Sequence, residues 1–177
     1  MKMNFTMMLL GLLSLGTANQ TWAGNCPCVD KETLTINQVY HQGSYSLATA
    51  ELSRLQNPEL QAMVKASLVE DQSKIKELSD ISVNAGIPLK PSDISDGFAN
   101  RSAQEVTALS GVTGPDLDRA YVSFRANELQ RLNTAFDTYF IPEVTTPTMK
   151  AWVAVERPRL QVQYNAARAL EQKMLNQ

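Results

Sequence analysis

Polar side chains interrupt three apolar stripes of this 177-residue chain, and their positions indicate a polar centre inside the protein. Asp71 and Gln72 break the first stripe, Glu128 breaks the second, and Gln163 breaks the third. Residues spaced three, four and seven apart share one face of a helix, so these groups should point toward a core. Burying an unpartnered polar group costs about 1–3 kcal/mol. We therefore expect these groups to bind one another, a water, or something held between the helices.

The side chains of such a polar centre could hold a metal ion or could hydrogen-bond to one another. Asp71 and Glu128 would supply two carboxylates, and Glu156, seven residues before Gln163, would supply a third. The chain has no Glu-x-x-His pair of the kind that di-iron bundles use, and amides are poor ligands for iron or zinc. Because a glutamine side chain can donate to carboxylates, we favour a closed hydrogen-bonded network, with no metal and no cofactor.

The single histidine, His41, offers little for catalysis. It lies beside Tyr40 and Gln42 in a helical pattern, and a lone helical histidine is more often exposed or satisfied in a core than a metal ligand. No serine or cysteine has the glycine-flanked pattern of an activated nucleophile, and His41 is the only imidazole that could serve as its base. The sequence favours a protein that is not an enzyme.

The polar residues need helices to position them, and the chain supplies the signals. Asn57-Pro58 and Thr146-Pro147 each place an N-cap residue before a proline at the first helical position. Ser102 and Glu105 have the spacing of a capping box. No run of alternating β-branched residues predicts a strand. The fold class is therefore all-α, an up-and-down bundle of four long helices with one short extra helix. The predicted helices cover residues 33–56, 58–84, 102–110, 116–140 and 147–175, with a loop over 87–101.

The first 23 residues have the features of a signal peptide. Lys2 precedes a short apolar run, and Thr21-Trp22-Ala23 places small residues at the positions that a signal peptidase reads. The run is too short to cross the roughly 30 Å hydrocarbon core of a bilayer. We therefore predict an exported, periplasmic protein with a signal peptide (1–23), a cysteine-containing tail (24–32) and a helical bundle domain (33–177).

Both cysteines, Cys26 and Cys28, lie in the predicted tail. In an oxidising compartment they could form a local disulfide or bridge to another chain, whereas capture of a thiophilic metal would need more soft ligands than the chain offers. The residues before Cys26 are similar to a lipidation box, but Asn25 stands where Gly or Ala is expected. The alternative prediction is therefore a lipoprotein anchored at a membrane surface.

Composition limits the partners. The chain has 16 basic and 18 acidic side chains, and the basic ones are scattered, so it lacks the charge pattern of a nucleic-acid binder. After the first 23 residues no segment approaches the roughly 20 apolar residues of a membrane helix. These features predict a single domain that does not span a membrane. They leave a protein partner and the oligomeric state open.

Several short motifs together resemble an exported bacterial family known as domain of unknown function 4142, a ferritin-like helical bundle. The resemblance runs from about Leu34 to Leu170 and depends on the order and spacing of the motifs. In chain order these are Asn57-Pro58-Glu59-Leu60, Leu68-Val69-Glu70-Asp71-Gln72-Ser73, Leu117-Asp118-Arg119-Ala120-Tyr121-Val122, Met149-Lys150-Ala151-Trp152 and Pro158-Arg159-Leu160-Gln161-Val162-Gln163.

The resemblance also implies what this chain has lost. Members of the family usually carry histidine at the positions of Gln72, Glu128 and Gln163, and such a cluster implies a metal-binding or proton-handling centre. Two hypotheses follow. The first is an exported, non-enzymatic bundle with a structural or partner-binding role and a degenerate polar centre, and the histidine losses favour it. The alternative is a metal-binding periplasmic ferritin-like protein with redox or stress-related activity.

Overall fold

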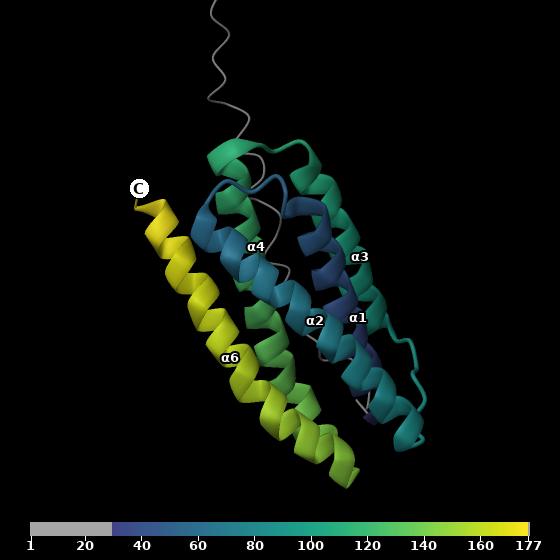
Figure 1. Ribbon diagram of the computed structural model, residues 1–177. Helices are drawn as coiled ribbons and strands as arrows, with labels where there is room; N and C mark the ends of the chain where they lie inside the picture. Colours follow the sequence, from purple (N-terminus) through teal and green to yellow (C-terminus); the bar gives the residue numbers. More distant parts are fainter. Residues whose placement is uncertain (1–29, 177) are drawn as a thin grey trace, which may run out of the picture.

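Helices make up nearly all of the part of the chain that the structure describes, residues 30–176, and no strand occurs within it (Figure 1). The structure is a computed structural model. The prediction of an all-α helical bundle is confirmed. The elements are α1 (Asp30–Glu51), α2 (Pro58–Asn84), α3 (Asp93–Ser110), α4 (Gly114–Ala135), the π-helical turn η2 (Phe136–Phe140), α5 (Ile141–Glu143) and α6 (Pro147–Leu175).

The two helices with a cap-then-proline start begin and end where the sequence predicts. The Asn57 side chain accepts hydrogen bonds from the backbone N–H groups of Glu59 and Leu60, which opens α2. The Thr146 hydroxyl accepts from the N–H of Met149 at the start of α6. These caps satisfy donors that have no partner within the helix, so local sequence is enough to fix both starts.

The bounds of two helices, α1 and α3, differ from the prediction. Helix α1 begins at Asp30, so the last three residues assigned to the tail are helical, and it ends at Glu51. Helix α3 begins at Asp93 because Ser92 and Ser95 form a reciprocal capping box. The Ser102–Glu105 spacing falls inside this helix. The extra helix is therefore 18 residues long and not short.

The π-helical turn η2 continues α4 toward a proline. Pro142 has no N–H, and in an α-helix its ring would crowd the carbonyl of the residue four positions earlier. At η2 the Ile141 N–H donates to the Phe136 carbonyl, five residues back, which widens the turn. We attribute the widened turn to this proline.

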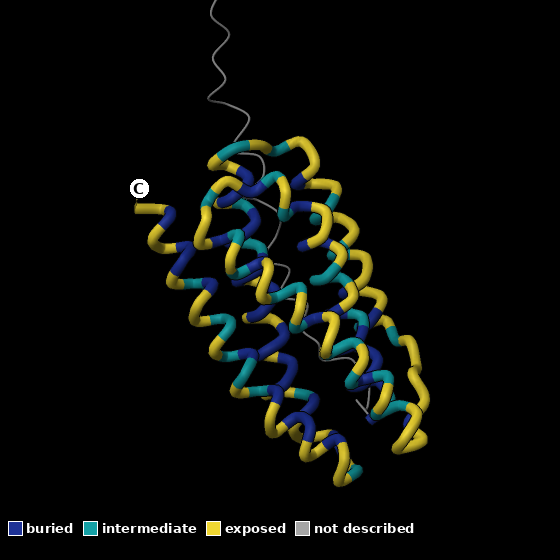
Figure 2. Tube along the Cα trace, in the orientation of Figure 1, coloured by how far each residue is buried: buried dark blue, intermediate teal, exposed yellow. Residues whose placement is uncertain are grey.

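The helices form two packed sets that face each other. Helix α1 packs mainly against α2 and α3, and α4 packs mainly against α6 (Figure 1). Buried residues line the inner faces, and exposed residues line the outer faces (Figure 2). The core between the sets contains Leu34, Leu78, Leu129, Phe136 and Leu160. None of the described helices combines the length and apolarity needed to span a membrane.

Candidate functional site

A histidine–aspartate pair joins α1 to α2 in the interior of the bundle. His41 Nδ1 lies 2.7 Å from Asp71 Oδ1, and the Ser44 hydroxyl donates to Asp71 Oδ2 at 2.5 Å. His41 is 1% exposed and Asp71 is 2% exposed. Because a carboxylate accepts, Nδ1 is the ring nitrogen that carries the proton of this bond. The pair therefore fixes the orientation of the ring and ties the two helices together.

Glu156 brings α6 to the same place. Its side chain is fully buried, with Oε1 3.6 Å from His41 Nε2 and Oε2 3.1 Å from Lys74 Nζ. Arg159, one turn further along α6, donates to both carboxylate oxygens, with Nε 2.9 Å from Oε2. Two cations thus face one buried carboxylate, so its charge is balanced within the protein.

The network reaches the surface through Glu70. This partly exposed α2 carboxylate pairs with Arg159 and accepts a hydrogen bond from the Gln163 amide. Lys74 also pairs with Glu77, with Nζ 2.6 Å from Oε2. These contacts join α2 to α6 through charged and amide side chains. We call His41, Ser44, Glu70, Asp71, Lys74, Glu156, Arg159 and Gln163 the polar centre.

The cations of the polar centre keep their charge at neutral pH. Burial lowers the pKa of Lys74, but the carboxylates of Glu77 and Glu156 outweigh it, so the pKa lies above its usual value. Burial lowers the pKa of Arg159 to about 10, still well above neutral pH. Both side chains are therefore protonated where they meet the carboxylates.

A second buried group lies between α1 and α4, around Arg125. Its NH1 donates to the Tyr40 hydroxyl at 2.9 Å, and its guanidinium carbon lies 5.5 Å from the centre of the Tyr40 ring. Burial raises the pKa of Tyr40. Burial lowers the pKa of Arg125, but Tyr40, Asp71 and other neighbours outweigh it and raise the pKa above its usual value. The guanidinium therefore stays charged inside the bundle.

Glu128 binds arginines and does not touch the histidine–aspartate pair. It is 4% exposed, with Oε1 2.8 Å from Arg131 NH1 and 3.4 Å from Arg101 Nε. Arg101 belongs to α3, so Glu128 ties α3 to α4. No hydrogen bond among residues 30–176 joins Glu128 directly to Asp71 or Glu156.

The structure brings together three of the five residues that the sequence assigned to the centre. Asp71 and Glu156 face the two nitrogens of one imidazole ring, and Gln163 joins them through Glu70. Glu128 is buried as predicted but has its own partners. The expected shared centre is thus two neighbouring groups of polar residues.

Gln72 is exposed, and the prediction that it faces the centre is wrong. The buried residues of α2 are Leu60, Val64, Asp71 and Leu78. Adjacent residues on an α-helix point about 100° apart, since 3.6 residues make a turn. A stripe that passes through Asp71 therefore turns Gln72 to the solvent.

Sequence reasoning missed His41, Ser44, Lys74, Arg159 and Arg125. A spacing signal existed for two of them. Lys74 follows Asp71 by three residues, and Arg159 follows Glu156 by three, so each cation shares a helix face with a stripe acid. No comparable pattern marked His41, because its partners come from other helices.

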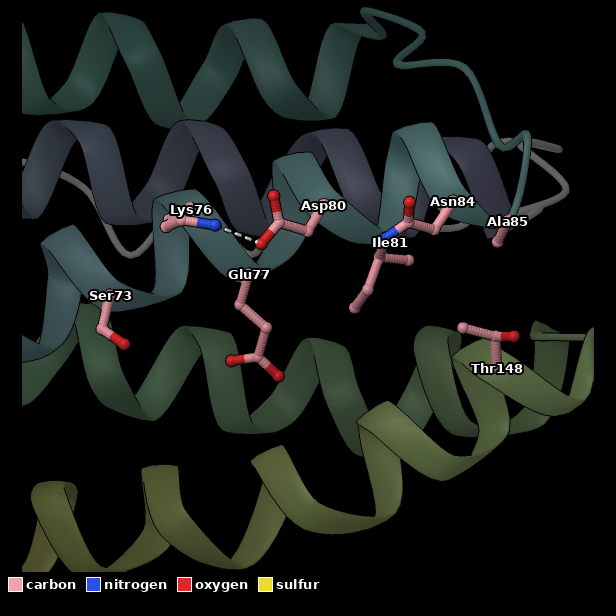
Figure 3. Close-up of a pocket in the computed structure, with 8 residues that line it drawn as sticks. All are labelled: Ser73, Lys76, Glu77, Asp80, Ile81, Asn84, Ala85 and Thr148. Carbon is pink, nitrogen blue, oxygen red and sulfur yellow. Dashed lines mark hydrogen bonds and ion pairs between the residues drawn. The ribbon is translucent and has the colours of Figure 1, made fainter.

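A shallow groove lies along the outside of α2, next to the start of α6 (Figure 3). It has a volume of about 580 Å³ and is lined by the last turns of α2 and by Thr148. Lys76 and Asp80 pair with each other there at 2.5 Å, and the Glu77 carboxylate points across the groove (Figure 3). It contains none of the buried groups described above.

The carboxylates that the sequence offers as candidate metal ligands do not fit a metal in this arrangement. Both oxygens of Asp71 accept from side chains, Glu156 is held by two cations, and Glu128 is held by two arginines. Within residues 30–176 no group of three or more histidine, cysteine, aspartate or glutamate side chains is arranged to hold an ion. Cys26 and Cys28 lie outside the described residues.

The fold and the site define an all-α bundle with an ion-paired polar interior. The chain belongs to the family described as domain of unknown function (DUF4142), whose model matches residues 66–170, more than half of the sequence. The matched range contains Asp71, Glu128 and Glu156, whereas His41 and α1 precede it. Comparisons with curated proteins and with solved structures found no match.

Proposed function

We propose that this protein is an exported, non-enzymatic helical bundle of the bacterial cell envelope, ferritin-like in architecture, with a structural or partner-binding role. The observation that carries the proposal is that each carboxylate of the polar centre is paired with a donor or cation of the protein. The oxygens of Glu70, Asp71 and Glu156 therefore already have partners within the protein. The signal-peptide features of residues 1–23 support export to the periplasm.

In this proposal the polar centre holds the helices in register. His41, Asp71 and Glu156 come from three different helices, and a shift of any one helix by a turn would leave a buried charge unpaired. Removing one partner of a buried pair costs about 3–5 kcal/mol, although the intact pair adds little net stability. The centre thus favours one packing over others, which suits a rigid scaffold for a partner.

Metal binding is the second candidate function, and one observation favours it. His41 Nε2 is buried and hydrogen-bonds to none of the described residues, while Asp71 orients the ring through Nδ1. A carboxylate on the far nitrogen is the usual support of a metal-binding histidine. Lys74 and Arg159 oppose this function, because a metal ion at Nε2 and Glu156 would have to displace or repel them.

Two measurements on untagged protein purified from the periplasm test the proposal. Elemental analysis should find Fe, Mn, Cu and Zn well below one ion per chain, whereas one ion per chain would favour the metal-binding function. The intact mass should correspond to a chain that begins at Gly24. A mass with a diacylated Cys26 would instead place the protein on a membrane surface, and retention in the cytoplasm would overturn the export proposal.

A further inference from the structure

A small cavity lies between α1, α3 and α4, on the Glu128 side of the polar centre. Its volume is about 10 Å³, the space that one water molecule needs. Six of its lining residues have polar side chains, and they come from all three helices. These are Tyr40, Ser44, Ser102, Tyr121, Arg125 and Glu128.

Two buried groups at this cavity have hydrogen-bonding capacity left over. Tyr121 is 2% exposed and lines the cavity, and its hydroxyl has no hydrogen bond to another described residue. Arg125 is 6% exposed and uses one of its five N–H donors, for the Tyr40 hydroxyl. The cavity admits one water molecule, and a water there can accept hydrogen bonds from these donors.

We propose that one buried water molecule occupies this cavity as a permanent part of the bundle. It accepts from Arg125 and exchanges hydrogen bonds with the hydroxyls of Tyr121 and Ser102. A buried water typically makes about three hydrogen bonds, which this lining supplies. The inference deepens the proposed structural role, because the water supplies the contact between the two groups of polar residues that the protein lacks.

The position of Ser44 explains how the two groups are connected. Ser44 lines the cavity and donates its proton to Asp71, so its oxygen still has lone pairs to accept from the water. The water in turn lies beside Arg125 and Glu128. The chain Asp71–Ser44–water–Arg125 then links α2, α1 and α4.

The charges at the cavity favour water over a small anion. Arg125 and the hydroxyls could attract chloride, but the Glu128 carboxylate lines the same cavity and Asp71 binds the neighbouring Ser44. A second negative charge beside a buried carboxylate is unfavourable in a medium of low dielectric constant. Water satisfies both the donors and the carboxylate, because it donates as well as accepts.

High-resolution crystallography of the full mature protein tests the site directly. One crystal is grown without halide and another is soaked in bromide. We expect a water peak within hydrogen-bond distance of the Tyr121 hydroxyl and Arg125 in both crystals, with no anomalous bromide signal. A dry cavity would overturn the proposal, and so would an anomalous peak, which would identify an anion site.

A double-mutant cycle provides a second readout in solution. Tyr121→Phe should lower the folding equilibrium constant roughly fivefold, as the loss of one hydrogen bond does. Tyr45→Phe, at a tyrosine that does not line the cavity, should change it less than twofold. Because one water serves Tyr121 and Ser102, the effects of Tyr121→Phe and Ser102→Ala should be non-additive. Additive effects would mean that no shared water connects these side chains. Neither result depends on export or metal content, so this inference and the proposed function can fail separately.

Discussion

The contact between Gly43 and Ser102 gives the sharpest prediction about how α1 and α3 pack. A Cβ atom added at Gly43 would lie 2.3 Å from Ser102 Oγ and 2.8 Å from Ser102 Cβ. Rotation of the serine side chain would move Oγ but not Cβ, so the backbones must separate. Overpacking of this kind costs about 1–3 kcal/mol. The better helix propensity of alanine returns about 1 kcal/mol. Gly43→Ala should therefore destabilise the protein by up to about 2 kcal/mol.

Gly97 offers a matched control within α3. It also lies inside a helix, but no heavy atom comes within 4 Å of an added Cβ. Gly97→Ala should therefore stabilise the protein by about 0.5–1 kcal/mol. The free energy of unfolding is measured by urea denaturation of both variants. Adding Ser102→Gly to Gly43→Ala should recover at least 1 kcal/mol, since it removes both clashing atoms.

Two outcomes would refute this reasoning. If Gly43→Ala stabilised the protein as much as Gly97→Ala, α1 and α3 would not be in close contact at this point. If Ser102→Gly were equally harmful in the presence and absence of Gly43→Ala, the cost would not come from the Gly43–Ser102 contact. A slope of free energy against urea that changed between variants would indicate a change in cooperativity instead.

The remaining predictions concern charged groups. Burial raises the pKa of Asp30, but hydrogen bonds from Thr145 and Thr146 outweigh it and lower the pKa. Asp30→Asn should therefore lower the free energy of unfolding by about 1–2 kcal/mol at pH 7. The difference between wild type and variant should vanish as pH falls through the lowered pKa. A difference that stayed constant with pH would exclude the carboxylate as its cause. Burial and the charge of Glu128 raise the pKa of Glu105. Glu105→Gln should therefore stabilise the protein by less than about 1 kcal/mol at pH values above the usual carboxyl pKa, and should have no effect at lower pH. A stabilisation that persisted in acid would have another origin. Glu156→Gln should cost about 3–5 kcal/mol in urea denaturation. An effect below about 0.5 kcal/mol would show that the buried charge is not coupled to its cations.

The sequence predicted much of the fold, because helix starts depend on neighbouring residues. Asn57 and Thr146 cap α2 and α6 with their own side chains, and each precedes a proline. The start of α3 could not be predicted in the same way, because the Ser102–Glu105 spacing indicates a later start than the Ser92–Ser95 capping box of the structure. The earlier start places Arg101 on a helix facing Glu128. The partner of Glu128 was therefore hidden until α3 was in place.

The candidate site was only partly predictable for a related reason. Periodicity within a helix tells which face is buried, and so identified Asp71 and Glu156. It does not tell which residue of another helix lies opposite. The sequence contains no other histidine and no local pattern that marks His41, yet two carboxylates from α2 and α6 face its ring. Gln72 follows Asp71 directly and stands where the family resemblance implies a histidine, and neither feature tells which way its side chain points.

The central claim is that protein groups alone pair with the carboxylates of the polar centre, and His41 allows a direct test. It is the only histidine in the chain, so the ¹⁵N NMR spectrum of untagged protein contains a single imidazole. At neutral pH, one equivalent of Zn²⁺ is added while the two ring nitrogens are observed. We predict that neither signal shifts, because Lys74 and Arg159 already balance Glu156. A stoichiometric shift of Nε2, with Nδ1 still bound to Asp71, would contradict the account and establish His41 as a metal ligand.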